Sequence, residues 1–184
     1  IKISKIFKKK SILHLHGSEF EVFYKKSSKN VKKLIANIFM TSDCVIVLGE
    51  RWLKFIKEIA PEANIQVVNN AVKVPEYTVK YDEECINILF LGVLIKRKGI
   101  YDLIEAINLI NGMNIANKKK VKFIIGGTGK EEVGVRSLIM KYNLNNCIDM
   151  VGWVDGTKKE ALLRESNVFV LPSYNEGLPM AILE

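Results

Sequence analysis

The sequence predicts a doubly wound α/β fold, with helices packed on mostly parallel sheets. Short apolar runs rich in valine and isoleucine alternate along the chain with segments of helical period, which is the order typical of parallel strands joined by helices. The 184 residues, with a hydrophobic content of 48%, suffice for one domain or for parts of two. A packed core is therefore expected rather than a disordered chain.

Seven strands and two of the helices can be placed in order. Each helical segment carries one apolar stripe, through Leu34, Ile35, Ile38 and Phe39 in residues 31–40 and through Trp52, Phe55, Ile56 and Ile59 in residues 50–60. The runs expected to form strands are residues 11–16, 44–48, 65–68, 86–91, 121–125, 147–151 and 168–171.

A break in this rhythm marks the expected domain boundary. Pro75 opposes regular structure, and residues 77–84 are polar apart from one valine and two tyrosines. The charge balance changes near the same place, because residues 1–80 hold 15 Lys and Arg against 7 Asp and Glu, whereas residues 81–184 hold 13 against 13. The expected organisation is a first domain, a linker and a second domain at residues 1–74, 75–85 and 86–184.

The net charge of +8 therefore comes from the first part of the chain. Its lysines would attract an anionic membrane surface or a phosphorylated acceptor, or they form an ordinary solvated surface; both interpretations stay open. The lysines in question are Lys8, Lys9, Lys10, Lys25, Lys26, Lys29, Lys32 and Lys33.

Several observations bear on the class of protein and its compartment. Three cysteines, Cys44, Cys85 and Cys147, are too scattered for a disulfide framework or a CxxC metal site, which favours a reducing cytoplasm. No apolar run approaches the roughly 18 residues that span a bilayer. The chain begins at Ile1 without the features of a signal peptide and stops at Glu184 within an expected helix, so we expect both ends to be cuts through a longer protein.

The strongest site pattern is residues 171–184, Leu-Pro-Ser-Tyr-Asn-Glu-Gly-Leu-Pro-Met-Ala-Ile-Leu-Glu, in which a buried strand, a polar turn and a helix follow one another. Pro179 suits a first helical turn, where its missing N–H has no partner to lose, and Gly177 lets the backbone approach a ligand closely. The N–H groups at a helix start favour phosphate or sugar oxygens. The carboxylates of Glu176 and Glu184 can accept hydrogen bonds from paired sugar hydroxyls, although spacing alone also fits a solvated pair.

This segment resembles the E-x(7)-E signature of the retaining family 4 glycosyltransferases. Further features similar to those of the family occur in the same order over nearly the whole chain: His14-Leu-His-Gly17, Val68-Asn-Asn-Ala-Val72, the glycine turn and Lys-Gly helix start within residues 87–106, Phe123-Ile-Ile-Gly-Gly-Thr-Gly129 and Val151-Gly-Trp-Val154. The resemblance implies a GT-B architecture of two Rossmann-like domains, both incomplete in this chain.

The resemblance also implies a role for each matching residue. Glu176 matches the carboxylate that contacts the transferred sugar, and Glu184 matches the one that holds the ribose hydroxyls. Lys98 matches the lysine that neutralises the diphosphate, and His16 matches the first-domain histidine that faces the cleft near the reacting sugar. The remaining implied donor-binding positions are the backbone of Gly177, Leu178, Pro179 and Met180, and the strand-end turns at Gly92, Gly127 and Val154.

Two departures from the family pattern leave questions open. Val93 stands where the family has arginine, so Arg97, beside Lys98, either supplies the second phosphate cation or points elsewhere. Asn69 stands where the family tends to have proline, which should affect only turn rigidity.

Three further side chains keep two interpretations each. His14 lies on the same strand face as His16 and has either a structural role or a place in the cleft; two histidines without a third ligand do not make a zinc site. Trp153 and Tyr174 either stack on a nucleotide base or pack in the interior.

The implied function is transfer of a sugar from a nucleoside diphosphate sugar to a glycan or lipid-linked acceptor, with retention of configuration, at the cytoplasmic face of the membrane. No Asp-x-Asp metal motif is present, and no metal or other cofactor is expected. The alternatives are a nucleotide-sugar 2-epimerase of the same fold or a nucleotide-binding fragment without turnover. A phosphorylase of this fold should carry a lysine site for pyridoxal phosphate, for which the sequence offers no candidate. A P-loop is excluded because Ile124 and Glu131 occupy its glycine and hydroxyl positions. Nucleic-acid binding is not expected, because no aromatic platform or groove helix is evident.

Overall fold

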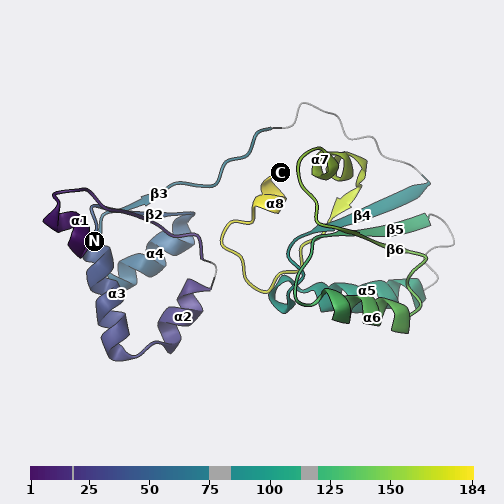
Figure 1. Ribbon diagram of the computed structural model, residues 1–184, viewed down its shortest axis with the longest axis horizontal. Coiled ribbons are helices and arrows are strands. Elements are labelled where there is room, and N and C mark those ends of the chain that lie inside the picture. The colour runs from purple at the N-terminus through teal and green to yellow at the C-terminus, as the bar shows by residue number, and fades with distance from the viewer. Residues whose placement is uncertain (18, 75–83, 113–119) are drawn as a thin grey trace. The chain divides into compact units, whose positions relative to one another are not determined.

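The computed structural model describes residues 1–17, 19–74, 84–112 and 120–184 (Figure 1). The expected linker at residues 75–85 lies outside the described residues except for its last two, and Cys85 already begins a strand. By their internal contacts the residues form two compact units, each built on a parallel sheet. Unit 1 comprises Ile1–Val72 with Asn175–Met180, and unit 2 comprises Lys73–Tyr174 with Ala181–Glu184.

Unit 1 contains a three-stranded parallel sheet in the order β1-β2-β3. Its strands are β1 (Ile12–His14), β2 (Cys44–Val47) and β3 (Ile65–Val67), and its helices are α1 (Lys2–Ile6), α2 (Phe20–Lys26), α3 (Lys29–Thr41) and α4 (Glu50–Ile59). Val45 and Val47 of the central strand point to one side, as alternate residues do. There they form one core with Phe39, Trp52 and Ile56 of the helices.

The two apolar helix stripes expected from the sequence differ in outcome. The α4 stripe is confirmed, because Trp52 and Ile56 are buried. In α3 Phe39 is buried, but the expectation is wrong for Leu34, which is 56% exposed. Leu34 and Ile38 instead line a small pocket of about 210 Å³ that includes Ile1. Helical period predicts a stripe, but the neighbouring elements decide how much of its width is covered.

Unit 2 contains a four-stranded, all-parallel sheet in the order β6-β5-β4-β7. Its strands are β4 (Cys85–Leu91), β5 (Lys120–Gly126), β6 (Ile148–Gly152) and β7 (Val168–Phe169), and its helices are η1 (Lys96–Lys98), α5 (Ile100–Gly112), α6 (Glu132–Lys141) and α7 (Gly156–Glu165). The final helix of the chain, α8, spans Met180–Leu183.

Both faces of the unit 2 sheet are covered. Phe90 belongs to a core with Ile104 of α5 and Val135 of α6. Its neighbour Leu89 points the other way and packs in a second cluster with Leu162 of α7. Figure 1 accordingly shows α5 and α6 on one side of the sheet and α7 on the other. This three-layer arrangement confirms the predicted doubly wound parallel sheet.

All seven expected strands are present among the described residues, and four of them, β1, β2, β3 and β7, are shorter than expected. The first ends at His14 rather than at residue 16, and the last ends at Phe169 rather than at residue 171. Val170 N–H still donates to the carbonyl of Leu89, with an N···O distance of 2.8 Å. Pro172 follows soon after and has no N–H to donate, which ends the ladder.

Candidate functional site

The strand order of unit 2 places a topological switch point at β4. The chain proceeds from β4 to β5 on one side, whereas β7 lies on the other side of β4. In open α/β sheets, ligands bind outside the carboxyl ends of the strands at such a point. The segments that leave the sheet there are residues 92–99 after β4 and residues 170–174 after β7. The candidate site of unit 2 therefore centres on these two segments.

The loops at this end of the sheet are joined to one another by backbone hydrogen bonds. Gly92 N–H donates to the Gly126 carbonyl at 3.0 Å, and Leu94 N–H donates to the Thr128 carbonyl at 2.9 Å. Gly127 N–H donates to the Gly152 carbonyl at 2.6 Å, which ties the loop after β5 to the end of β6. We call the loops after β4 and β5, together with the end of β6 to which they are joined, the loop platform. Its hydrogen bonds involve no side chain.

Two glycines are required where segments of unit 2 touch. Gly127 has a φ of 138°, and a Cβ at this position would stand 1.9 Å from the Gly92 carbonyl oxygen. Gly99 has a φ of 68°, and its Cβ would stand 2.0 Å from the Pro172 carbonyl oxygen. Both positions disfavour any residue with a side chain. Gly127 thus forms a tight strand-to-helix turn, and Gly99 brings the start of α5 against the segment after β7.

The cationic residues predicted to meet a diphosphate lie on η1, at the switch point. Arg97 and Lys98 are both half-buried there, whereas Val93 is 47% exposed. Tyr174 N–H donates to the Arg97 carbonyl at 2.9 Å, so the segment after β7 is joined directly to η1. Next to this bond lies the Ser173 hydroxyl, which is buried and has no hydrogen-bond partner within the described part of the chain.

Glu184 forms an ion pair that the sequence did not reveal. Lys159 of α7 donates from Nζ to Glu184 Oε1 at 2.7 Å, and the two side chains are only 31% and 26% exposed. The ammonium group balances the carboxylate charge and fixes one of its oxygens. No spacing rule could have found this pair, because its members lie on different elements and meet only through the fold.

In unit 1 the Glu-Gly-Leu-Pro segment lies beside the end of β1. A Cβ on Gly177 would stand 3.8 Å from the His16 carbonyl oxygen. Asn70 donates from Nδ2 to the Leu178 carbonyl at 3.0 Å. Unit 1 therefore brings His16 and Gly177 together and holds the segment with an asparagine. The sequence analysis quoted Asn70 within a motif but gave it no role.

His14 and His16 form a pair on the exposed side of β1. His16 Nε2 and His14 Nδ1 are 3.1 Å apart, and the ring centroids are 3.9 Å apart with a tilt of 52°. The shared strand face predicted from their spacing is confirmed by this contact, although β1 itself ends at His14.

The predicted site residues fall into two groups, one in each unit. Unit 1 contains His16, Glu176, Gly177, Leu178, Pro179 and Met180, and unit 2 contains Gly92, Arg97, Lys98, Gly127, Val154 and Glu184. Glu176 is half-buried, and Pro179 directly precedes α8. The Val154 side chain is half-buried and packs against the cluster beneath α7.

Trp153 and Tyr174 are not interior residues. They are 63% and 69% exposed, so the packing interpretation is wrong for both; stacking on a base stays a prediction. Each donates a hydrogen bond to a carboxylate, Trp153 Nε1 to Asp155 at 3.0 Å and Tyr174 OH to Asp102 at 2.5 Å. The bond to Asp102 raises the pKa of the Tyr174 phenol.

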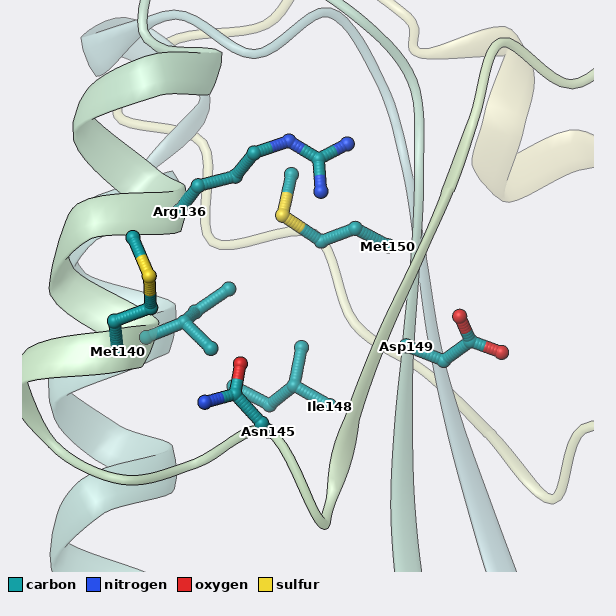
Figure 2. Close-up of a pocket in the computed structure, with 7 residues that line it drawn as sticks. Arg136, Met140, Asn145, Ile148, Asp149 and Met150 are labelled. Carbon is teal, nitrogen blue, oxygen red and sulfur yellow. The ribbon is translucent and has the colours of Figure 1, made fainter.

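A pocket of about 320 Å³ lies elsewhere, between α6 and the edge strand β6 (Figure 2). Its lining is Arg136, Ile139, Met140, Asn145, Ile148, Asp149 and Met150. Ile148 is the first residue of β6, whereas the switch point lies at the carboxyl ends of the strands. None of the predicted site residues lines this pocket, and we do not assign the donor site to it.

The described residues contain neither a cluster of metal ligands nor a membrane-spanning helix. Within that part of the chain, no three His, Cys, Asp or Glu side chains gather as a set of metal ligands. No helix there combines the length and apolarity required to cross a bilayer.

The sequence of the chain matches a family model described as "Glycosyl transferases group 1" over residues 78–184, more than half of its length. The chain belongs to this family. The match includes both segments that meet at the switch point. The predicted family is confirmed at this level.

Glycosyltransferases named for colanic acid and amylovoran biosynthesis are among its relatives. The putative colanic acid biosynthesis glycosyltransferase WcaL of Salmonella typhimurium is 27% identical over 157 residues, covering 80% of this chain and 38% of WcaL. The amylovoran biosynthesis glycosyltransferase AmsK of Erwinia amylovora is 22% identical over 190 residues, covering 98% of this chain and 45% of AmsK. The chain thus spans less than half the length of these relatives.

Solved structures confirm the fold class. TarM of S. aureus, solved in complex with fondaparinux, alpha-GlcNAc-glycerol and UDP, matches 98% of this chain with a TM-score of 0.73 and 23% identity, covering 36% of TarM. Sucrose-phosphate synthase from Thermosynechococcus elongatus matches 97% of this chain with a TM-score of 0.74 and 18% identity, covering 48% of that enzyme. The parallel sheets and these neighbours support a partial GT-B fold, as predicted.

Proposed function

We propose that this group 1 glycosyltransferase transfers a sugar from a nucleoside diphosphate sugar to a glycan or lipid-linked acceptor with retention of configuration. The observation that carries the proposal is that the segments following β4 and β7 meet at the switch point. There the Tyr174 N–H to Arg97 carbonyl bond joins the segment after β7 to the cationic η1. The UDP and sugar ligands of the related fold in TarM support a nucleotide-sugar donor.

Charge stabilisation is the main task of the unit 2 residues in this proposal. When the bond between the anomeric carbon and the diphosphate oxygen breaks, negative charge develops on the departing diphosphate. Lys98 and Arg97, both half-buried on η1, stabilise this charge, and preorganised groups of this kind are the largest contributors to many enzymatic rates. Arg97 takes the role of the arginine that Val93 replaces. The reaction needs no metal ion in this scheme.

The carboxylates bind the two ends of the donor. Glu184, fixed by Lys159, accepts hydrogen bonds from the ribose hydroxyls, and Glu176 accepts them from the transferred sugar. The acceptor oxygen attacks the anomeric carbon on the face that the diphosphate leaves, and its proton passes to a diphosphate oxygen. The new bond therefore has the configuration of the old one.

Calorimetric titration of the protein with UDP, GDP and ADP tests the donor site. One nucleotide should bind, and Glu184→Ala should weaken its binding by about 1–3 kcal/mol, because a charged hydrogen bond is lost. The matched control is Glu160→Ala, which removes an exposed carboxylate of α7 and should leave the affinity unchanged. Binding of none of the three, or equal effects of the two variants, would exclude this donor site.

The role of Arg97 has its own control on the same short helix. Arg97→Met should weaken binding of the nucleoside diphosphate about tenfold or more, as expected for loss of a charged contact, with a smaller effect on the monophosphate. Lys96→Met removes an exposed cation from η1 and should change neither affinity. If the two variants behave alike, Arg97 does not contact the phosphates.

The basic residues of unit 1 support peripheral contact with an anionic membrane that carries the acceptor. Of the eight lysines identified in the sequence, seven are exposed, and Lys32 is half-buried and donates to the Lys25 carbonyl. Each basic group near an anionic surface contributes about 1 kcal/mol to binding. Sedimentation with vesicles should show binding to phosphatidylglycerol but not to phosphatidylcholine, and binding should fall as salt is raised. Equal binding to both vesicles, or to neither, contradicts this localisation.

A further inference from the structure

A glycine joins the cationic η1 to α5 in unit 2. Arg97 and Lys98 end η1, Gly99 follows with a φ of 68°, and α5 begins at Ile100. Because glycine adopts many backbone conformations, Gly99 alone determines the direction of η1 relative to α5 only weakly. The position of the two cations therefore depends on what else holds η1 and α5 together.

The segment after β7 crosses this joint and contacts it on both sides. Pro172 packs so closely on Gly99 that a Cβ there would stand 2.0 Å from the Pro172 carbonyl oxygen. Before the glycine, the Arg97 carbonyl accepts a hydrogen bond from the Tyr174 N–H at 2.9 Å. After it, Asp102 Oδ2, in the first turn of α5, accepts one from the Tyr174 hydroxyl at 2.5 Å. Tyr174 therefore fixes η1 against α5, with its backbone on one side and its side chain on the other.

We propose that Asp102 and Tyr174 are positioning residues, whose hydrogen bond holds the η1 cations in place for the diphosphate of the donor. This inference rests on the proposed function, in which Arg97 and Lys98 stabilise the departing diphosphate. Charged groups stabilise a developing charge best when they are already in place and need not reorganise. A shift of η1 would displace both cations, so loss of the bond should affect the diphosphate more than the rest of the nucleotide.

Calorimetric titration of single variants tests the positioning role. The probes are UDP, GDP or ADP, whichever binds, and the corresponding monophosphate. Tyr174→Phe removes the hydroxyl but keeps the ring, so any stacking on a base is retained, and Asp102→Ala removes the acceptor. Each should weaken binding of the diphosphate about 2- to 12-fold, the range of one ordinary hydrogen bond, because this one is exposed to water. The effect on the monophosphate should be smaller.

Two further variants show whether the bond itself is responsible. Asp102→Asn retains an acceptor oxygen and should restore part of the affinity. The double variant of Tyr174→Phe with Asp102→Ala should lose no more affinity than either single variant, because both remove the same bond. Additive losses would mean that the two residues act independently, and they would overturn the proposal.

A pair of the same chemistry, one turn further along α5, supplies the matched control. Tyr142 OH donates to Glu105 Oε1 at 2.8 Å, and this bond joins α5 to the end of α6 rather than to η1. Tyr142→Phe should leave the affinity for both probes unchanged. Equal losses in Tyr142→Phe and Tyr174→Phe would reflect a general loosening of unit 2 and would overturn the positioning role.

The same titrations separate failure of this inference from failure of the proposed function. If Arg97→Met weakens diphosphate binding but Tyr174→Phe and Asp102→Ala do not, the positioning role alone is wrong. If Arg97→Met binds as tightly as the unmodified protein, or if none of the three nucleotides binds, the proposed function fails and this inference fails with it.

Discussion

Replacing Gly127 by alanine tests the loop platform most directly. The new Cβ would stand 1.9 Å from the Gly92 carbonyl oxygen, and the φ of 138° is a conformation that alanine rarely adopts. The conformational strain costs about 1–3 kcal/mol. Relieving the clash requires the platform backbone to shift, which adds about 1–3 kcal/mol. We therefore expect the free energy of unfolding to fall by about 2–6 kcal/mol.

Urea denaturation followed by circular dichroism measures this change, and two other glycines separate its causes. Gly152 has a φ of 72° but nothing within 4 Å of its Cβ position, so Gly152→Ala should cost only the strain, about 1–2 kcal/mol. Gly112, at the end of α5, has neither problem, and Gly112→Ala should be neutral or stabilising by up to about 1 kcal/mol. If Gly127→Ala destabilises no more than Gly152→Ala, the backbone contact between the loops after β4 and β5 is refuted.

Three further predictions concern stability and its pH dependence. Ile104→Ala empties a fully buried position of α5 and should lower the free energy of unfolding by about 2–5 kcal/mol in the same urea experiment. Hydrogen bonds from the Ser11 backbone N–H and hydroxyl lower the pKa of Asp43 below its ordinary 3.8. These bonds therefore stabilise the fold above pH 3.8, and the stabilisation is lost as the pH falls through the pKa of Asp43 in the folded protein. Asp43→Asn should remove this part of the acid sensitivity from a pH series of urea midpoints. The hydrogen bond to Glu131 raises the pKa of Tyr101 above its ordinary 10.0. The bond therefore contributes its full stabilisation below pH 10, and this stabilisation is lost as the pH rises through the pKa of Tyr101 in the folded protein. Glu131→Gln should lower this pKa in an ultraviolet absorbance titration.

The sequence allowed the strands to be predicted because each is a short apolar run between turn residues. Strand ends were harder to place. Pro172 ends the ladder of β7, but only the pairing with β4 shows which residues still belong to it. Leu34 shows the corresponding limit for helices, since its stripe position predicts burial but the side chain is 56% exposed.

The candidate site was predictable where a motif is contiguous and unpredictable where the fold joins distant residues. The Glu-Gly-Leu-Pro segment and the Lys-Gly helix start could be recognised from local sequence. The partner of Glu184 could not, because Lys159 carries no distinguishing neighbour in the sequence. Spacing placed His14 and His16 on one face, but only the side-chain geometry shows which nitrogens meet.

The backbone bonding of the loop platform has a consequence for how new specificities could arise. Side chains at Val93, Thr128 and Trp153 are exposed, while the hydrogen bonds beneath them are the same for every residue that retains its N–H. Randomising these three positions should leave the sheet and its loops intact and vary the surface that a nucleotide would meet. Two kinds of substitution should disrupt the platform: proline at a residue whose N–H donates one of these bonds, and any residue with a side chain at Gly127. The scaffold therefore separates the residues that maintain the fold from those free to diverge, which suits a chain whose relatives share only about a quarter of its sequence.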